Sequence, residues 1–333
     1  MSGQGKRMSG PLACPLYVDS SHGVAHKTVT EQYPYRRTTP MTTLFIILLI
    51  ACAAGFWVAA TTLLFFLYES RNSGYVKTLA DMGYSSSAII RRILGFGFLS
   101  EIGIYLQTLT TPVTGWIWSP KRRGEVNEDN GDVPVLLVHG LYGNASNWLA
   151  FRWKLKRSGV RHVYAYSYNS FGPDYFALLE KLDRMVDATR ARHGGRPVFL
   201  VGHSLGGLLI RGYASSGMAV ENGECKIAGA TTIGAPLEGS KLAALAVGKL
   251  GRSIIYRSEL IQELEKRDVA PPFPCLAIYS PIDNFVLPNS SMDPKMHGWR
   301  TEHSPAVTHV CMLFSRPVMR RVAEFFKECV KSV

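Results

Sequence analysis

A short apolar run that leads directly into a serine between two glycines constrains the fold of this chain more than any other feature. Residues 198–201 read Val-Phe-Leu-Val, and residues 202–206 continue as Gly-His-Ser-Leu-Gly. The run predicts a buried strand, and the apolar spacing of residues 205–215 predicts a helix immediately after it. Ser204 would then lie at a tight turn, where the flanking glycines leave room for the chain. We therefore expect Ser204 to be a nucleophile at the amino end of a helix, whose dipole favours developing negative charge.

The remainder of residues 125–333 continues this alternation of strand and helix. Strands are expected at residues 133–138, 163–168, 198–201, 227–233 and 276–279, and helices at residues 147–158, 174–192, 205–215 and 318–330. Short strands that are apolar throughout and alternate with helices are typical of a parallel sheet covered on both faces. We therefore predict an α/β fold with a mostly parallel sheet, for a catalytic domain at residues 125–333 with an insert at about residues 240–272.

A serine nucleophile needs a base that removes its proton and a carboxylate that orients the base. Asp283 follows the expected strand at residues 276–279 by one short turn, which suits the acid; the alternative is an ordinary turn residue. Three later histidines are candidates for the base: His297, His303 and His309. We favour His309, which opens the final helical segment, over His303 in a more polar loop and over His297.

Two backbone N–H groups are expected to bind the oxyanion that forms when the serine attacks a carbonyl. One belongs to Leu205, the residue after the nucleophile. The other is expected from Leu141, in the loop His-Gly-Leu-Tyr-Gly-Asn that follows the first strand. Because the donors are backbone groups, the side chain at either position matters little for this role.

An apolar segment near the amino end predicts membrane attachment. Residues 44–67 contain no charged residue, and these 24 residues would rise about 36 Å as a helix, enough to cross a hydrocarbon core of about 30 Å. We predict a transmembrane signal anchor at residues 41–68, after a disordered leader at residues 1–40. The alternatives are a cleaved signal peptide, for which the segment is long and starts late, and a lipid anchor on Cys52. A small Lys and Arg excess before the segment favours an amino terminus on the inside, and we predict a single-pass protein with its catalytic domain on the exported side.

Residues 69–124 hold a second apolar stretch and then a charged linker. Glu101 interrupts the stretch at residues 89–109, and a carboxylate at mid-membrane depth is costly. We therefore predict an amphipathic or interfacial helix there. The alternative, a second span, would return the catalytic domain to the starting side. The linker at residues 120–132 is rich in charge and contains glycine, which marks a domain boundary.

The chain carries a net charge of +12. This bias suits a neighbour of anionic lipid, and the lack of a basic stripe with interleaved aromatic residues argues against nucleic acid as a partner. The six cysteines show no Cys-x-x-Cys pair and no zinc-like spacing, and we predict neither a metal nor a cofactor. Buried thiols are the expected state, with a disulfide between Cys225 and Cys275 as the alternative in an exported domain.

Four segments together resemble the bacterial triacylglycerol lipases and related membrane-anchored esterases of the α/β-hydrolase superfamily: VPVLLVHGLYGNASNW, RPVFLVGHSLGGLLIRGYA, TTIGAPLEGSKLA and THVCMLF. The resemblance covers about residues 133–330, and the Gly-Ala-Pro-Leu-Glu-Gly-Ser segment narrows it toward lipases. It implies the α/β-hydrolase fold. It also implies a set of site residues, with the triad Ser204, Asp283 and His309 and the oxyanion donors Leu141 and Leu205.

These features predict a membrane-anchored serine hydrolase that cleaves carboxylic esters, such as those of lipids, through an acyl-enzyme on Ser204. An acyltransferase, a thioesterase, an amidase or a peptidase would use the same triad. A catalytically silent membrane scaffold is an alternative of another class, although serine, acid and histidine occur in the expected order. The apolar residues of the insert at residues 240–272 would suit either an acyl-binding lid or a packed structural helix.

Overall fold

The computed structural model describes residues 40–104, 132–293 and 296–331. The chain divides into two compact units, residues 1–43 and residues 44–333, and the architecture below is that of the second unit. The predicted leader, most of the linker and the end of the predicted amphipathic segment lie outside the described residues.

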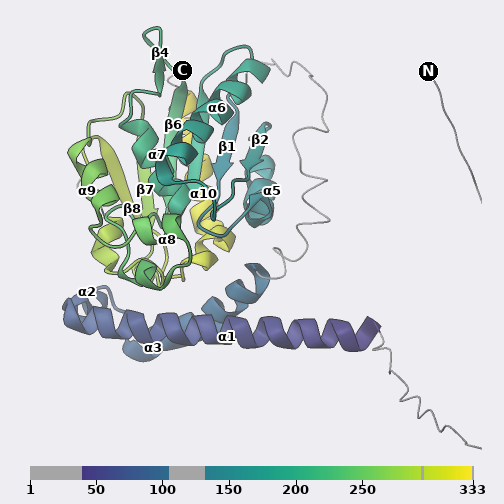
Figure 1. Ribbon diagram of the computed structural model, residues 1–333, viewed down its shortest axis with the longest axis vertical. Coiled ribbons are helices and arrows are strands. Elements are labelled where there is room, and N and C mark those ends of the chain that lie inside the picture. Colours follow the sequence, from purple (N-terminus) through teal and green to yellow (C-terminus); the bar gives the residue numbers. More distant parts are fainter. Residues whose placement is uncertain (1–39, 105–131, 294–295, 332–333) are drawn as a thin grey trace, which may run out of the picture. The chain divides into compact units, whose positions relative to one another are not determined.

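Six strands form one parallel sheet in the spatial order β2-β1-β3-β6-β7-β8 (Figure 1). Their bounds are β1 Val135–Val138, β2 Val163–Tyr166, β3 Val198–His203, β6 Ile227–Ile233, β7 Cys275–Tyr279 and β8 Trp299–His303. Every residue of β1, β3, β6 and β7 is buried, as expected for strands covered on both faces. The predicted parallel sheet is confirmed. It has one strand more than the sequence indicated, because β8 is a polar and largely exposed edge strand.

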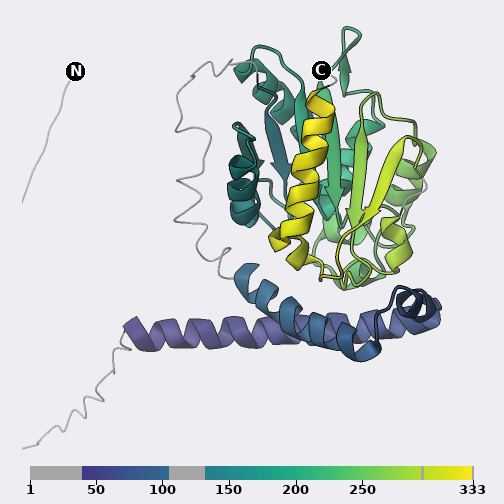
Figure 2. The same cartoon turned by 180° about the vertical axis from the view of Figure 1, so that it is seen from behind.

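Helices cover both faces of the sheet, and the alternation of side chains along each strand separates two cores (Figures 1 and 2). Leu136 and Val138 of β1 pack in one core with α6 and α7, whereas Val135 and Leu137 pack in the other with α5 and α10. The bounds of these helices are α5 Leu149–Arg157, α6 Tyr175–Arg192, α7 Leu205–Ala214 and α10 Arg316–Val330. Every residue of α7 is buried, so the serine turn that precedes it is held in the centre of the domain.

Short helices and one small hairpin make up the connections. Their bounds are η3 Ala145–Trp148, η5 Asn289–Met292 and η6 Val310–Phe314, with β4 Val220–Glu221 paired to β5 Glu224–Cys225. The predicted insert between β6 and β7 contains η4 Lys241–Leu245, α8 Lys249–Ser253 and α9 Glu259–Lys266. Cys225 and Cys275 are free thiols, so the alternative of a disulfide between them is not realised.

The segment before the linker is helical. Its elements are α1 Pro40–Asn72, α2 Tyr75–Asp81, α3 Ser86–Arg92 and the π-helix η1 Ile93–Gly97, followed by helical residues 98–104. Among the described residues, α1 is the one helix long and apolar enough to cross a membrane, with a mean hydropathy of 2.5 over Met41–Asn72, although a signal sequence meets the same criterion.

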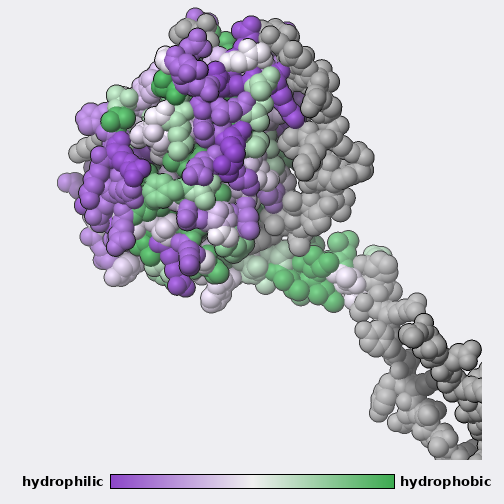
Figure 3. All heavy atoms as spheres, turned by 45° about the horizontal axis from the view of Figure 1, so that its top comes forward, coloured by the Kyte–Doolittle hydropathy of each residue, from purple (hydrophilic) through white to green (hydrophobic). Residues whose placement is uncertain are grey.

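The two ends of α1 differ in their surroundings. Residues 41–50 are all exposed, and the exposed part of the helix presents a hydrophobic surface (Figure 3). From Ala51 onward, one face of the helix is buried, at Ala51, Gly55, Ala59, Thr62, Leu63, Phe66, Glu69 and Ser70. Steps of three and four residues place these side chains on one side of the helix. The carboxyl-terminal half of α1 is therefore packed, whereas its amino-terminal end has an apolar surface exposed.

Candidate active site

Ser204 lies at the turn between β3 and α7, in a backbone conformation that side chains rarely adopt. Its φ is 54° and its ψ is −124°. The turn is held by three backbone hydrogen bonds. The Ser204 N–H donates to the carbonyl of Ile233 over 2.9 Å, and the carbonyl of Ser204 accepts the N–H groups of Gly207 over 2.9 Å and Leu208 over 3.2 Å. Strained backbone of this kind is retained where the surrounding structure enforces it, typically at functional sites.

Glycine is required at Gly206 and Gly140, because atoms of neighbouring segments come too close to these positions for a side chain. A Cβ at Gly206 would meet the backbone carbonyl of Val138 and would lie 2.6 Å from the carbonyl oxygen of His139. A Cβ at Gly140 would lie 2.8 Å from the Cβ of Ser204. The loop after β1 therefore passes directly beside the serine.

The His309 and Asp283 side chains form a buried hydrogen-bonded pair. His309 Nδ1 donates to Asp283 Oδ2 over 2.6 Å, and Asp283 is fully buried. The other carboxylate oxygen of Asp283 accepts the backbone N–H groups of Phe285 and Val286, each over 2.9 Å. In the neutral imidazole, the one N–H proton is on Nδ1 and is donated to the carboxylate in this hydrogen bond, so Nε2 is left as a proton acceptor.

The two other candidate histidines lie elsewhere. His303 is at the end of β8, where its Nε2 is 3.2 Å from the hydroxyl oxygen of Tyr279. The ring of His297 is exposed, with Nδ1 3.5 Å from Asp268 Oδ2. Among the three, only His309 contacts Asp283.

Two contacts bring the His309–Asp283 pair next to the serine turn. His203, the residue before Ser204, donates from Nε2 to the carbonyl of His309 over 3.1 Å, and the two imidazole centroids are 4.6 Å apart. Gly234 directly follows Ile233, whose carbonyl accepts the Ser204 N–H. A Cβ at Gly234 would lie 3.1 Å from Asp283 Oδ2 and 3.2 Å from His309 Nδ1. The serine turn and the pair thus share the segment that ends β6.

Burial keeps the two neighbouring histidines neutral. It lowers the pKa of His203 well below its usual value, and it lowers the pKa of His139 to about 4. The hydrogen bonds of His139 agree with a neutral ring, since Nδ1 donates to the carbonyl of Gly140 over 2.8 Å and Nε2 accepts the Tyr168 N–H over 3.0 Å. Both rings therefore serve as fixed hydrogen-bonding groups rather than as competing bases.

The two expected oxyanion donors lie at the serine turn and in the loop after β1. Leu205 is the first residue of α7, a position whose N–H has no acceptor within the helix. Leu141 follows Gly140, and its N–H has no acceptor among the described residues. The loop is held by bonds on either side: Tyr142 N–H donates to Ser170 Oγ over 3.0 Å, and Gly143 N–H donates to the Gly140 carbonyl over 3.1 Å.

The insert meets this loop at Tyr142. The Tyr142 hydroxyl donates to the carbonyl of Val247 over 2.5 Å and accepts the Val247 N–H over 2.7 Å. The ring of Tyr142 stacks on Phe171 with the centroids 5.2 Å apart. Large apolar side chains are exposed around this junction, at Tyr142, Phe171, Leu245 and Val247. The insert thus borders the loop that carries Leu141 and presents an apolar surface beside it.

Sequence reasoning missed two buried polar residues close to the base. Asn284 is 1 % exposed, and its Oδ1 accepts the backbone N–H of His309 over 3.1 Å. Glu101 is 6 % exposed, and burial raises its pKa to about 7, with the His309 charge acting in the opposite direction. Neither follows a motif. Asn284 could have been noticed only as the neighbour of the acid, and Glu101 was interpreted as the polar interruption of an interfacial helix.

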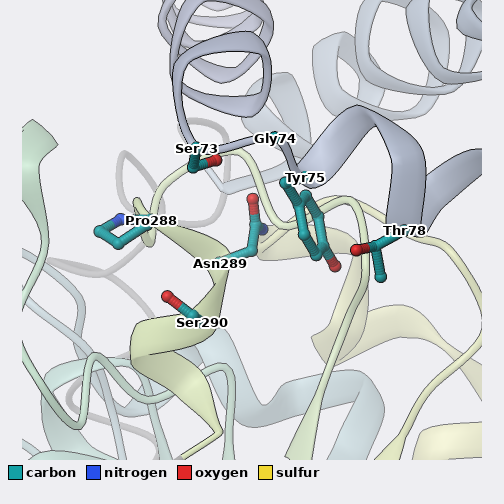
Figure 4. Close-up of a pocket in the computed structure, with 7 residues that line it drawn as sticks. All are labelled: Ser73, Gly74, Tyr75, Thr78, Pro288, Asn289 and Ser290. Atoms are coloured by element: carbon teal, nitrogen blue, oxygen red, sulfur yellow. The ribbon is translucent and has the colours of Figure 1, made fainter.

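A separate polar pocket of about 130 Å³ lies where the end of α1 meets the turn before η5 (Figure 4). It is lined by Ser73, Gly74, Tyr75, Thr78, Pro288, Asn289 and Ser290. Its connection to the site is indirect, because Asn289 Nδ2 donates to the backbone carbonyl of Asp283 over 2.9 Å. Within the described ranges, no group of three or more His, Cys, Asp or Glu side chains is arranged to hold a metal ion.

Comparison with known proteins bears on the fold and the family. The model of the alpha/beta hydrolase family matches residues 135–326. No curated protein sequence matches the chain. Similar solved structures include a monoacylglycerol lipase of Paleococcus ferrophilus, which is 17 % identical, with 60 % of this chain and 96 % of that chain covered at a TM-score of 0.46. The lipase BlEst2 of Bacillus licheniformis is 13 % identical, with 60 % of this chain and 93 % of that chain covered at a TM-score of 0.49.

Since the family model spans more than half of the chain, including the serine turn and both loops of the His309–Asp283 pair, this protein belongs to the alpha/beta hydrolase family.

Proposed function

We propose that this protein is a membrane-anchored serine hydrolase that cleaves carboxylic esters of lipase or esterase type. The observation that carries the proposal is the buried 2.6 Å hydrogen bond between His309 and Asp283, next to a serine held at positive φ. A neutral imidazole that is oriented by a carboxylate and keeps Nε2 free is the group that can remove a serine proton.

The reaction would proceed through an acyl-enzyme. Ser204 Oγ attacks the ester carbonyl carbon while His309 Nε2 accepts the hydroxyl proton, and Asp283 stabilises the resulting imidazolium. The N–H groups of Leu141 and Leu205 bind the oxyanion of the tetrahedral intermediate. His309 then returns the proton to the leaving alcohol. A water molecule, deprotonated by the same imidazole, then attacks the acyl carbon. The bond from that carbon to Ser204 Oγ breaks, His309 returns the proton to Ser204 Oγ, and the acid is released.

Two features support a lipid ester over other acyl compounds. The apolar side chains of Tyr142, Phe171, Leu245 and Val247 are exposed beside the loop of Leu141, where they would suit an acyl chain. The exposed apolar end of α1 would hold the catalytic domain, which we assign to residues 125–333, at a bilayer on the exported side of a bacterial inner membrane.

The proposal is tested on the full chain in detergent micelles. A fluorophosphonate probe should label the wild type and spare Ser204→Ala, and nitrophenyl esters should be hydrolysed. A rate maximum at long acyl chains would support a lipase and one at short chains an esterase, whereas preferred transfer to an added alcohol would identify an acyltransferase. Absence of both labelling and ester turnover in the wild type would contradict the proposal.

A further inference from the structure

The acid and the base lie on two loops that rest on the N-terminal helices. We define the acid loop as residues 280–289 and the base loop as residues 304–310. Ile282 and Leu287 of the acid loop and Ala306 of the base loop belong to one apolar cluster with side chains of α1, α2, α3 and η1. The partners from the helices are Leu63, Phe66, Leu79, Ile89 and Ile93. The helix with the exposed apolar end, α1, therefore also packs against the two loops.

A polar chain of hydrogen bonds runs through this apolar contact. Asn284 Nδ2 donates to Thr62 Oγ1 over 2.7 Å, and Thr62 Oγ1 donates to the carbonyl of Ala59 over 3.2 Å. The Oδ1 of the same amide accepts the backbone N–H of His309 over 3.1 Å. Both ends of the Asn284 amide are thus used, one on α1 and one on the base.

Because the groups in this chain of hydrogen bonds are buried, each depends on its protein partner. Thr62 is 3 % exposed, Asn284 1 % and His309 5 %, so water does not compete for these groups. A buried amide that loses one partner is costly, and it can recover the lost bond only by turning away from the other partner. The amide orientation also follows, since its oxygen must face the His309 N–H and its NH₂ group must face the threonine.

Further contacts from the N-terminal helices hold the two sides of the base. Arg92 Nη1 donates to the carbonyl of Ala306 over 2.7 Å, and Cys311 Sγ donates to the carbonyl of Phe96 over 3.1 Å. A Cβ at Gly97 would lie 3.3 Å from Thr308 Cγ2. These contacts fall on residues 306, 308 and 311, on both sides of His309.

We propose that Thr62 of α1 is a positioning residue for the base, acting on His309 through the side chain of Asn284. This inference rests on the proposed hydrolase function. A helix that only tethers the domain would need no buried threonine hydroxyl bonded to the loop of the acid. The functional unit therefore extends beyond residues 125–333, and the catalytic domain cut away from its helices would lack the support of both loops.

The test compares three substitutions at neighbouring positions of α1, in the full chain in detergent micelles. Thr62→Val keeps the shape and removes the hydroxyl, Thr62→Ser restores the hydroxyl, and Thr61→Val makes the same change at an adjacent, partly exposed threonine. We expect Thr62→Val to lower kcat for a short nitrophenyl ester about tenfold at unchanged KM, since loss of alignment acts on the transition state. Thr62→Ser and Thr61→Val should stay within about twofold of the wild type.

Asn284→Ala, which leaves α1 unchanged, covers the case in which Thr62→Val folds poorly. It should lower kcat at least as much as Thr62→Val at unchanged KM, and a wild-type kcat in Asn284→Ala would overturn the relay. Asn284→Ala removes the other end of the same bond, so the double variant Thr62→Val/Asn284→Ala should lose no more than Asn284→Ala alone. Effects that multiply would show independent roles and overturn the relay, as would a wild-type kcat in Thr62→Val or an equal loss in Thr61→Val.

One readout does not depend on ester turnover. The downfield proton resonance of the His309–Asp283 hydrogen bond should shift or broaden in Thr62→Val and persist in Thr61→Val. A wild type without ester turnover but with this pattern would contradict the proposed function and retain the relay. An unchanged resonance in Thr62→Val would overturn the relay whatever the activity.

Discussion

The two sides of the site are built in different ways. Ser204 lies where β3, β6 and α7 meet, and the backbone hydrogen bonds and glycine contacts described above for its turn fall within residues 138–233. Asp283 and His309 lie on loops whose supports come from far along the chain, such as Thr62, which is 222 residues from Asn284. The proposed nucleophile is thus held within the sheet and its covering helices, whereas the proposed acid and base also contact the N-terminal helices. Perturbing each side separately should reveal this difference.

The largest expected effect is that of Ser204→Ala, which should reduce kcat for nitrophenyl esters roughly 10⁶-fold, because the covalent step is lost. The melting temperature should stay near that of the wild type, since the turn is held by backbone bonds that alanine retains. Steady-state kinetics and a thermal melt check the two statements. Substantial residual turnover would assign the nucleophile to another residue.

Asp283→Asn should lower kcat about 10⁴-fold, the next largest effect. The amide oxygen can still accept the N–H groups of Phe285 and Val286, which turns the amide NH₂ toward His309 Nδ1. The ring must then carry its proton on Nε2 and cannot accept one from the serine. The measurement is kcat at neutral pH, and a loss below tenfold would remove Asp283 from the role of acid.

Two glycine substitutions compare the rigidity of the two sides directly. In Gly206→Ala, the new Cβ would meet backbone carbonyls of Val138 and His139, which cannot move without displacing β1. We expect the free energy of unfolding to fall by about 3 kcal/mol or more. In Gly97→Ala, the new Cβ would be close to one side-chain atom, Thr308 Cγ2 at 3.3 Å, with Ile93 Cγ2 and Thr308 Cβ at 3.9 Å, and a loss within about 1 kcal/mol is expected.

Denaturant unfolding of both variants in the same detergent gives the comparison. A Gly206→Ala protein as stable as the wild type would show that the serine turn is looser than its contacts indicate. A severe loss in Gly97→Ala would show that the base side is packed as rigidly as the serine side.

The same contrast explains what the sequence could predict. The serine turn follows from local features, because a buried strand, a helix and the glycines between them occur within one short segment. The parallel sheet follows from apolar runs, except for β8, whose exposed residues Trp299–His303 carry no apolar pattern. The sequence favoured His309 over His303 and His297, but all three follow the acid in the chain, and only the fold shows which of them contacts Asp283.

The contacts that hold the His309 loop could not be predicted, because the residues that form them are distant in sequence and no motif marks any of them for this role. The contact of Arg92 with Ala306 spans 214 residues, and that of Cys311 with Phe96 spans 215. The apolar pattern of α1 predicted a span along its whole length. Only packing distinguishes its exposed first turns from the half that carries Thr62.

Among these variants, Glu101→Gln should change turnover least. Its effect on the pH dependence of stability tests the packing of the helix at residues 98–104. Burial raises the Glu101 pKa from 4.5 to about 7. Between these values Glu101 is ionised in the unfolded chain and protonated in the folded chain, so its contribution to wild-type stability falls as pH rises and is lowest above pH 7. The total loss is about 3 kcal/mol. Because Gln cannot ionise, the stability of Glu101→Gln relative to the wild type should rise by that amount from pH 4.5 to pH 8.

Thermal melts at pH 4.5 and pH 8 measure this difference, with Glu324→Gln, an exposed glutamate on α10, as the matched control for loss of one negative charge. Parallel pH profiles for Glu101→Gln and the wild type would show that Glu101 reaches water, and hence that this helix does not cover the base loop. A pH dependence removed by Glu101→Gln but not by Glu324→Gln would place a buried, titrating carboxyl group on the helical side of the site. The side of Ser204, by contrast, is built from backbone groups and the neutral imidazoles of His203 and His139.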